Sequence, residues 1–406
     1  MRSRSGSGNR VVVLAYTEYP YDPRVRREAE ALAKEGYQVH VIAAKSRGGP
    51  LVGPLAGVCV HEVPLATRRG AKGRYLYQYV LFGLLSAAWL VPLHFRHRFN
   101  LVHVHSPPDF QVFTAIPLKL IGIPVVLDLR ESTPELARAR FGLSTESILF
   151  RALVGLQVLS CRAADHVVVA CEGIREMAIT RRLPPDRITT VQNTVVVEDH
   201  RPTAEELRRR LSLPRESFIV HASGLNPERD LETLIRAVAR LSSDFPLHVV
   251  FAGEGEPSYV SKLRRLAQDL GVANRMHFVG RLAPVDAQAL VSLSEIGVVT
   301  SESNPNADLG WPTRLSEFAT FGKPLILPRL KSLSAALSDR ARFYTPGDAA
   351  SLSRELAAML FDANRRAQFA KMSQEVGELV AWKRIREVLL SVFRALRRSP
   401  SNQGGQ

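Results

Sequence analysis

The sequence predicts an α/β protein built from two doubly wound parallel sheets, one in each of two successive domains. Short apolar segments recur along the chain, and amphipathic segments of helix length separate them. This alternation is typical of parallel strands that helices cover on both faces. The chain has 406 residues, which is enough for two ordinary domains. Two prolines and a charged helix interrupt the alternation at residues 194–215, so we place the domain boundary there.

Seven strands are expected in the first domain and six in the second. Those of the first domain lie at residues 11–16, 39–44, 59–63, 101–105, 125–129, 166–170 and 188–191. Those of the second domain lie at residues 218–222, 247–252, 276–279, 296–300, 325–327 and 343–345. A helix at residues 24–36 follows the first strand, because Val25, Ala29 and Leu32 share one face. Further helices are expected at residues 204–211, 348–360 and about 363–396.

The domain limits follow from this order of elements. We expect the first domain at residues 11–199, the second at residues 200–375, and a C-terminal helix at residues 376–398. The two ends, residues 1–10 and 399–406, are short and rich in Gly, Ser and other polar residues, so we expect them to be disordered.

The composition narrows the classes of partner. The net charge is +15 and the isoelectric point is about 10.2, which predicts attraction to phosphorylated ligands, an anionic membrane or nucleic acid. The basic residues are scattered, and no zinc-finger or RNA-binding motif occurs, so we do not expect a nucleic-acid partner. Cys59, Cys161 and Cys171 have no metal-ligand spacing, and their odd number favours a reducing, cytoplasmic compartment. No metal site is expected.

Residues 75–93 contain no charged side chain and are strongly apolar. The stretch is just long enough to cross a bilayer, which needs about 20 residues. Gln78, Gly83, Ser86 and Pro92 weaken the spanning interpretation, and strands are expected on both sides of the stretch. We therefore expect either a core helix or an interfacial helix that lies on an anionic membrane surface.

The segment at residues 310–324 carries the most information about function. A short helix is predicted to begin at Pro312, after the strand at residues 296–300 and a polar loop, and parallel sheets bind ligands at this end of their strands. Arg314 and Glu317 lie off the apolar face of this helix. A fixed cation such as Arg314 can bind a phosphate, and a carboxylate such as Glu317 can accept hydrogen bonds from two sugar hydroxyls. The pair therefore indicates a nucleotide-sugar site. The alternative is a surface helix with an ion pair between residues three apart.

Six segments now resemble, in order, the sequence landmarks of family 4 glycosyltransferases. They are Y-D-P-R-V-R-R-E-A-E-A-L at 21–32, L-V-H-V-H at 101–105, A-D-H-V-V-V at 164–169 with V-Q-N at 191–193, A-S-G through R-D-L-E-T-L-I-R-A at 222–237, V-F-A-G-E-G at 250–255, and P-T-R-L-S-E-F with G-K-P at 312–324. Each motif is short, but their order and spacing together cover about residues 11–375.

The resemblance implies a GT-B fold, in which two Rossmann-like domains face a cleft and the final helix returns to the N-terminal domain. It implies transfer of a sugar from a nucleotide-diphosphate sugar to a glycan, lipid or small-molecule acceptor, with retention at the anomeric carbon. No metal or other cofactor is implied, and the sequence contains no Asp-x-Asp pair. The leaving diphosphate then needs fixed cations.

The resemblance also assigns residues. It implies that Arg229 and Arg314 stabilise the leaving diphosphate and that Glu317 binds the ribose hydroxyls. The other donor-binding candidates are Gly224, Gly253, Gly255, Asp308 and Leu315. For Gly253 and Gly255, a plain turn remains an alternative to a base pocket.

The chain departs from the family pattern at three positions. Leu309 stands where many members carry a first Glu, and Leu225 stands where an Arg is usual. Arg130 replaces a His near the acceptor; it cannot act as a base at pH 7, but it can bind a phosphate or orient an acceptor. Beside it, Glu131 is either an acceptor-side residue or part of a helix start.

Two more polar features have structural alternatives. Asp22 fits a helix N-cap at least as well as a catalytic role. We expect His103 and His105 to point to opposite faces of their strand, with one packed and the other at the cleft end of the strand. The three departures keep two other functions open, namely a nucleotide-sugar epimerase and a non-catalytic GT-B protein that binds a nucleotide sugar.

Overall fold

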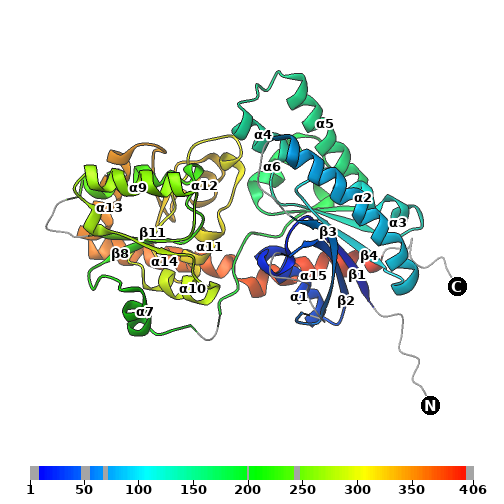
Figure 1. Ribbon diagram of the computed structural model, residues 1–406, viewed down its shortest axis with the longest axis horizontal. Coiled ribbons are helices and arrows are strands. Elements are labelled where there is room, and N and C mark those ends of the chain that lie inside the picture. Colours follow the sequence, from blue (N-terminus) through cyan, green and yellow to red (C-terminus); the bar gives the residue numbers. More distant parts are fainter. Residues whose placement is uncertain (1–8, 47–54, 67–71, 199–200, 242–246, 399–406) are drawn as a thin grey trace, which may run out of the picture. The chain divides into compact units, whose positions relative to one another are not determined.

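The computed structural model describes residues 9–46, 55–66, 72–198, 201–241 and 247–398, and it divides into two compact units (Figure 1). Unit 1 comprises Met1–Gln192 together with Ile385–Gln406, and unit 2 comprises Asn193–Arg384. The units therefore meet in the chain at Gln192, whereas the sequence places the boundary after residue 199. The ends expected to be disordered lie outside the described residues, except that Asn9 is described and Arg10 opens the first strand.

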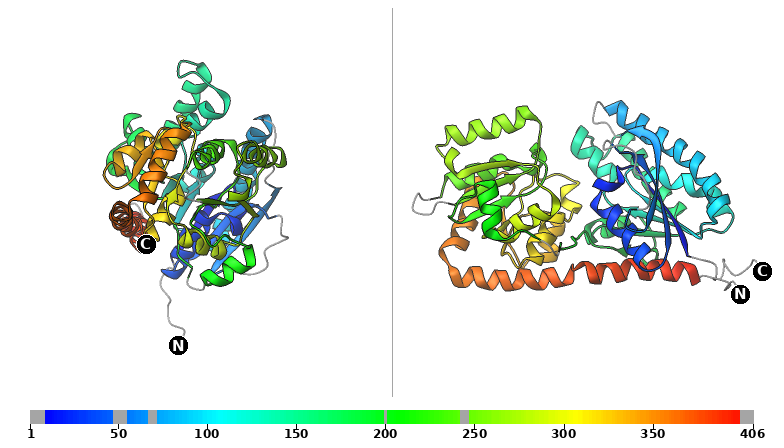
Figure 2. Two further views of the ribbon diagram at one scale, coloured as in Figure 1. Left: turned by 90° about the vertical axis from the view of Figure 1, so that its left-hand side faces the viewer. Right: turned by 60° about the horizontal axis from the view of Figure 1, so that its bottom comes forward.

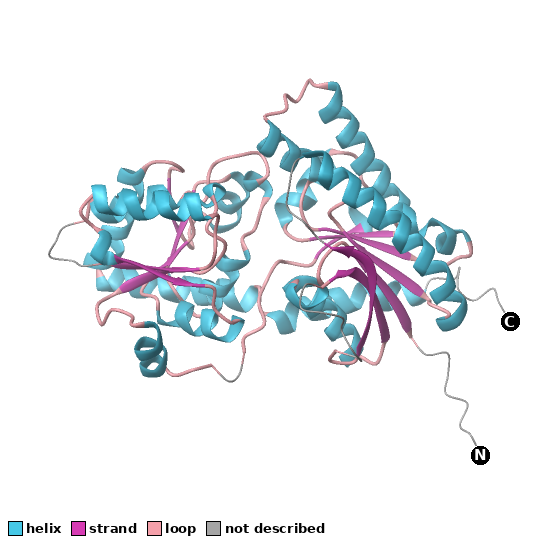
Figure 3. Cartoon of the chain, viewed as in Figure 1, coloured by secondary structure: helices cyan, strands magenta, loops and turns pink. Residues whose placement is uncertain are grey.

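Unit 1 is built on one parallel sheet of seven strands in the order β3-β2-β1-β4-β5-β6-β7 (Figure 3). The strands are β1 Arg10–Ala15, β2 Gln38–Lys45, β3 Val58–Ala66, β4 Leu101–His105, β5 Val125–Leu129, β6 His166–Val169 and β7 Ile188–Thr190. All seven predicted strands are confirmed. They are identifiable from the sequence because strands buried on both faces are continuously apolar.

Helices cover both faces of this sheet. They are α1 Pro23–Lys34, α2 Lys72–His97, α3 Ile116–Leu120, α4 Thr133–Phe141, α5 Ile148–Ala163, α6 Glu172–Thr180 and α15 Trp382–Arg398, with a 3-10 segment η2 at Asp109–Ala115. Figure 2 shows α15 on one side of the sheet and α2 on the other. The apolar face predicted for α1 is buried at Val25, Ala29 and Leu32.

The C-terminal helical region consists of two helices where the sequence predicts one continuous helix. α14 ends at Leu379, and α15 begins at Trp382. From Ile385 onward α15 belongs to unit 1. There Phe393 packs edge-on against Tyr37, and the Arg397 guanidinium donates to Asn9 Oδ1 at 2.6 Å.

Unit 2 contains two three-stranded parallel sheets, β10-β9-β8 and β11-β12-β13. A main-chain hydrogen bond from Glu295 N, just before β11, to Phe218 O in β8 connects them at 2.9 Å. The strands are β8 Phe218–His221, β9 His248–Ala252, β10 Met276–Gly280, β11 Gly297–Val298, β12 Leu325–Pro328 and β13 Arg342–Tyr344. The helices are α7 Ala204–Leu211, α8 Leu231–Ala239, α9 Pro257–Asp269, α10 Pro284–Leu293, α11 Thr313–Thr320, α12 Lys331–Leu337, α13 Ala349–Phe361 and α14 Ala363–Leu379. Every strand predicted for this half is present.

A histidine cluster in unit 1 makes its stability depend on pH. His40 Nδ1 lies 2.9 Å from His61 Nε2, and the His97 ring centroid is 4.2 Å from that of His40. Burial, together with His97, His61 and Arg10, lowers the pKa of His40 to about 4. The folded chain therefore binds fewer protons than the unfolded chain below pH 6.5, so the free energy of unfolding falls as the pH drops from about 6.5 towards 4.

We expect the free energy of unfolding to fall by about 2 kcal/mol from pH 7 to pH 5 because of His40. Urea unfolding at both pH values, for the wild type and a His40→Gln variant, measures this cost as the difference between their pH responses. Equal pH responses of the two proteins would contradict the assignment to His40.

Candidate functional site

Two loops and the start of a helix in unit 2 meet at the carboxyl ends of β8 and β9. The loop after β8 and the loop after β9 are joined by a hydrogen bond from Leu225 N to Glu254 O at 2.9 Å. A Cβ atom on Gly253 would lie 1.9 Å from the Ser223 carbonyl oxygen, and one on Gly255 would lie 2.2 Å from the Leu225 carbonyl oxygen. Glycine at these two positions thus allows the loops to pack main chain against main chain.

Helix α11 is the third part of this region and begins directly after Pro312. Its buried face carries Leu315, Phe318 and Ala319, as predicted. Arg314 forms an ion pair with Glu317 and donates to the Ala222 carbonyl at the end of β8. The ion pair of the alternative interpretation is therefore present, but Glu317 is only 4% exposed, so it is not a surface pair.

Arg229 supplies a second cation beside Arg314. It is exposed at the end of a 3-10 turn, Pro227–Arg229, that follows β8. Burial, together with repulsion from Arg229, lowers the pKa of Arg314 to about 10. Both guanidiniums also act on His221, whose pKa is lowered to about 3 mainly by burial. An anion between the two arginines would relieve their repulsion.

The remaining donor-side candidates occupy different positions. The Leu315 side chain is fully buried in the core, and its N–H donates to the Pro312 carbonyl at 3.0 Å. Asp308 is half-buried, and its Oδ1 accepts from Lys331 N at 3.2 Å. Gly224 is exposed in the loop after β8. Leu225, in place of the usual Arg, is 2% exposed and part of the core.

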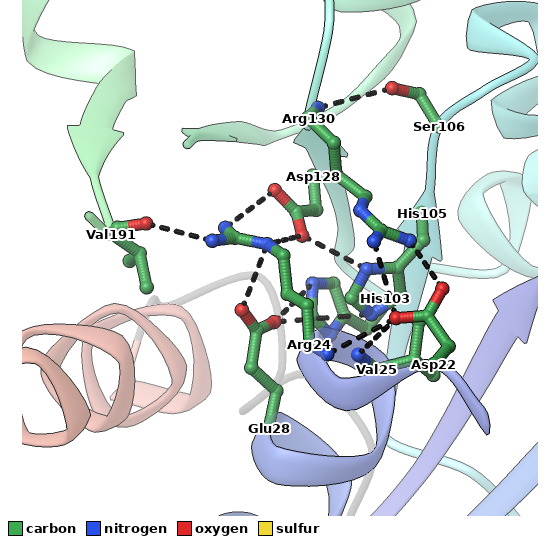
Figure 4. A network of polar contacts seen from close by, with 10 residues as sticks. All are labelled: Asp22, Arg24, Val25, Glu28, His103, His105, Ser106, Asp128, Arg130 and Val191. Carbon is green, nitrogen blue, oxygen red and sulfur yellow. Dashed lines mark hydrogen bonds and ion pairs between the residues drawn. The ribbon is translucent and has the colours of Figure 1, made fainter. Parts of the chain in front are cut away.

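A buried polar network lies in unit 1 (Figure 4). The Arg24 guanidinium donates to both carboxylate oxygens of Asp128, at 2.8 and 2.9 Å, and lies 3.1 Å from Glu28 Oε1. It also donates to the Val191 carbonyl at 3.0 Å. Although burial raises the pKa of Asp128, Arg24 and His105 hold it well below its usual range. One cation thus contacts two carboxylates that are completely shielded from solvent, and burial together with Asp128 raises the pKa of Glu28.

His103 and His105 complete this network. Both Nε2 atoms lie 3.9 Å from Glu28 Oε2, and His105 Nδ1 lies 2.9 Å from Asp128 Oδ2. Both rings are buried and His105 is the last residue of β4, but the expectation that the two side chains point to opposite faces is wrong. Residues two apart on a strand share a face, which places the rings 4.2 Å apart.

The network is also a possible metal-ligand set. Glu28, His103, His105 and Asp128 offer ligand atoms that all lie within 4.8 Å of one another. Imidazole and carboxylate groups suit a transition metal. Arg24 already supplies a positive charge to both carboxylates, so the cluster has electrostatic compensation without a metal ion. The members of this cluster come from three separate segments of the chain, α1, β4 and β5, so no sequence motif contains them.

Arg130 and Asp22 form the partly exposed end of the network. Arg130 Nη1 lies 2.7 Å from Asp22 Oδ2, and Nη2 lies 3.2 Å from Oδ1. Asp22 Oδ1 also accepts from Arg24 N and Val25 N, both at 3.1 Å, which confirms the N-cap interpretation. Burial lowers the pKa of Arg130, but Asp22 outweighs this and raises it, so Arg130 is a fixed cation. Glu131 beside it is exposed.

Two protein-family models match the chain in succession. The model described as "Glycosyl transferase 4-like domain" matches residues 21–194, and the model described as "Glycosyl transferases group 1" matches residues 203–376. The chain belongs to the family 4 glycosyltransferases. The predicted family and the GT-B fold class are both confirmed for this glycosyltransferase.

Among curated relatives, the glycosyltransferase is similar to two enzymes named D-inositol 3-phosphate glycosyltransferase. That of Thermomonospora curvata is 24% identical over 73% of this chain and 71% of the relative. That of Salinispora tropica is 27% identical over 46% of this chain and 40% of the relative. The match to the Salinispora enzyme thus spans less than half of that relative.

Solved structures share the fold at low sequence identity. Sucrose-phosphate synthase from Thermosynechococcus elongatus has a TM-score of 0.75 and 17% identity, with 96% of this chain and 99% of the other covered. HepE from Anabaena in complex with UDP has a TM-score of 0.71 and 14% identity, with 96% of this chain and 100% of the other covered. At this level of identity the likeness establishes the fold alone.

Proposed function

We propose that this glycosyltransferase moves a sugar from a nucleotide-diphosphate sugar to an acceptor, with retention at the anomeric carbon and without a metal. The observation that carries the proposal is the pair of neighbouring cations, Arg229 and Arg314, at the carboxyl end of β8. Their repulsion is unfavourable in the free protein and is relieved by a bound diphosphate. The charge that develops on the leaving diphosphate is then stabilised by groups already in place.

The other residues have roles consistent with this reaction. Glu317 is proposed to accept hydrogen bonds from the ribose hydroxyls while its ion pair holds Arg314 in place. The main chain at Gly224, Gly253 and Gly255 is proposed to line the donor site. In a same-face mechanism the leaving phosphate itself takes the acceptor proton, so Arg130 need not be a base. Support for a uridine donor comes from the fold neighbour HepE, which was solved with UDP.

The donor site is tested by nucleotide binding. We expect one of UDP, GDP and ADP to raise the melting temperature of the wild type in a thermal-shift panel, because a ligand that binds only the folded state stabilises it. Arg229→Ala is expected to lower the affinity for that nucleotide about 10- to 100-fold, as measured by calorimetry, since a charged hydrogen-bonding partner is lost. Arg229 is exposed, so this variant leaves the buried pair of Arg314 and Glu317 intact.

Arg265→Ala is the matched control, because it removes the same charge from an exposed position on α9. Unchanged affinity in Arg229→Ala, or an equal loss in Arg265→Ala, would refute the donor site. Turnover separates the remaining alternatives. A labelled donor converted only when acceptor is present supports a transferase, conversion without acceptor supports an epimerase, and binding without conversion supports a non-catalytic protein.

The acceptor is proposed to meet Arg130 at the carboxyl end of β5. Several curated relatives are named D-inositol 3-phosphate glycosyltransferase, so an inositol phosphate is the first acceptor to assay. We also propose a cytoplasmic location at the inner, anionic face of the cell membrane. The high net charge and the three free thiols, Cys59, Cys161 and Cys171, support this location.

A further inference from the structure

Helix α2 has an inverted distribution of polar and apolar side chains. Its buried side carries Gln78, Phe82, Ser86, Leu90 and His94, one residue every four, and three of these five are polar. Its solvent side carries large apolar residues, with exposed fractions between 38% and 67%: Leu76, Tyr77, Val80, Leu84, Trp89 and Phe95. A helix that covers a domain in water shows the opposite arrangement.

The exposed apolar surface continues onto neighbouring helices. α2, α3 and α5 all contact η2 on the same face of the unit 1 sheet (Figure 1). Leu120 on α3 is 81% exposed and Ile148 on α5 is 86% exposed. Of the 18 exposed large hydrophobic residues among those described, 13 lie between residues 76 and 159. We call the solvent-facing surface of α2, α3 and α5 the apolar face.

The charged side chains on the three helices of the apolar face are all basic, although Lys119 on α3 is paired with Asp165 at 2.9 Å. The sequences of α2, α3 and α5 contain no Asp or Glu. Arg96, Arg151 and Arg162 are exposed on α2 and α5, and Lys119 lies on α3. An apolar surface edged by arginines and lysines complements a layer with an apolar interior and an anionic surface, which describes a bilayer of acidic lipids.

The fold favours an α2 that lies along such a surface over one that crosses it. Among the described residues it is the one helix long and apolar enough to span a membrane, over Leu76–His97. However, β3 before it and β4 after it belong to the same sheet. Its inner side is also occupied, because the Tyr16 hydroxyl donates to Gln78 Oε1 at 2.9 Å and the Tyr16 ring packs against Phe82. The helix is therefore already fixed to unit 1 along one side.

We propose that unit 1 docks on an anionic bilayer through the apolar face, with α2 parallel to the membrane plane. The outer side chains of α2, α3 and α5 enter the boundary between headgroups and acyl chains, while the arginines bind lipid phosphates. This inference rests on the proposed membrane location. It adds which surface of unit 1 contacts the membrane and how α2 is oriented there.

The test uses the purified full-length protein and co-flotation with vesicles. We expect the wild type to float with vesicles of phosphatidylcholine and phosphatidylglycerol at low salt, and far less with phosphatidylcholine alone. Leu84→Glu and Phe95→Glu are each expected to lower the partition coefficient at least about tenfold, because each places a carboxylate in the apolar layer. Arg151→Gln is expected to lower it about fivefold on anionic vesicles only.

Phe361→Glu is the matched control, because Phe361 is 58% exposed but lies on α13 of unit 2. It is expected to float like the wild type. If the wild type ignores anionic vesicles, both the location and the apolar face are refuted. If it floats and Leu84→Glu and Phe95→Glu float equally well, the apolar face is refuted and the location stands.

Two further readouts complete the test. If the wild type is a dimer in size-exclusion chromatography and Leu84→Glu is a monomer, the apolar face binds a second copy and lipid docking is refuted. The nucleotide-induced thermal shift is measured on every variant and is expected to remain unchanged, since Leu84, Phe95 and Arg151 lie in unit 1 and Phe361 is not one of the proposed donor-binding residues. A variant that keeps this shift but loses flotation supports the docking surface whatever the outcome for catalysis.

Discussion

Replacing Arg24 with alanine is expected to lower the free energy of unfolding of unit 1 by about 3–5 kcal/mol. Arg24 is 3% exposed and is the cation between Asp128 and Glu28, which are both fully buried. Without it two carboxylates remain in a region from which water is excluded, and the cost of burying an uncompensated charge is high. Hydrogen exchange of the β4 and β5 amides at increasing urea concentration measures the loss, because those strands carry His105 and Asp128.

Arg26→Ala provides the matched control on the same helix. Arg26 pairs with Glu30 at 2.6 Å and with the same four-residue spacing, but its side chain is 49% exposed. Solvent already screens this pair, so its removal is expected to cost no more than about 0.5 kcal/mol. Similar losses in the two variants would show that the network contributes no more than a surface ion pair does.

Gly253→Ala is expected to destabilise unit 2 by about 3 kcal/mol and to abolish the nucleotide-induced thermal shift. The new methyl group would overlap the main-chain oxygen of Ser223, and a main-chain atom cannot move aside as a flexible side chain can. The loops after β8 and β9 must therefore separate, and the separation would displace Gly224 and the nearby Arg229. Thermal unfolding with and without the nucleotide selected by the panel measures both effects.

Gly155→Ala is the contrasting substitution. A Cβ atom there meets nothing within 4 Å, and the residue lies inside helix α5. Alanine at this position is expected to stabilise unit 1 by about 0.5–1 kcal/mol, because glycine is a poor helix former. If Gly253→Ala retained wild-type stability and nucleotide binding, the close packing of the two loops would not be needed for the donor site.

Most strands could be predicted from the sequence because they are largely buried and therefore mainly apolar, as β1, β2, β4 and β5 are, whereas the edge strand β3 is only partly buried. Segments 101–105 and 125–129 coincide with β4 and β5 without any shift. Arg314 and Glu317 could also be identified, since they stand off the apolar face of a short helix next to a strand end. In these cases local sequence and tertiary environment require the same residue types.

Features that depend on contacts between distant segments could not be predicted in this way. The network joins Arg24 to Asp128 across 104 residues, and sequence spacing contains no record of such a contact. The exposed apolar side of α2 could not be predicted from hydropathy either. An apolar stretch has the same composition whether its apolar residues face the core or the solvent. A motif position by itself also does not show which way a side chain points, and that of Leu315 belongs to the buried face of α11.

Asp22 performs two tasks with one carboxylate. Its oxygens cap the first turn of α1 and also hold Arg130, the residue proposed to meet the acceptor. Any substitution at this position changes the start of a helix and the position of a site residue together. A change of acceptor during evolution is therefore easier through Arg130 and its surroundings than through Asp22, where selection for folding and selection for specificity act on the same atoms.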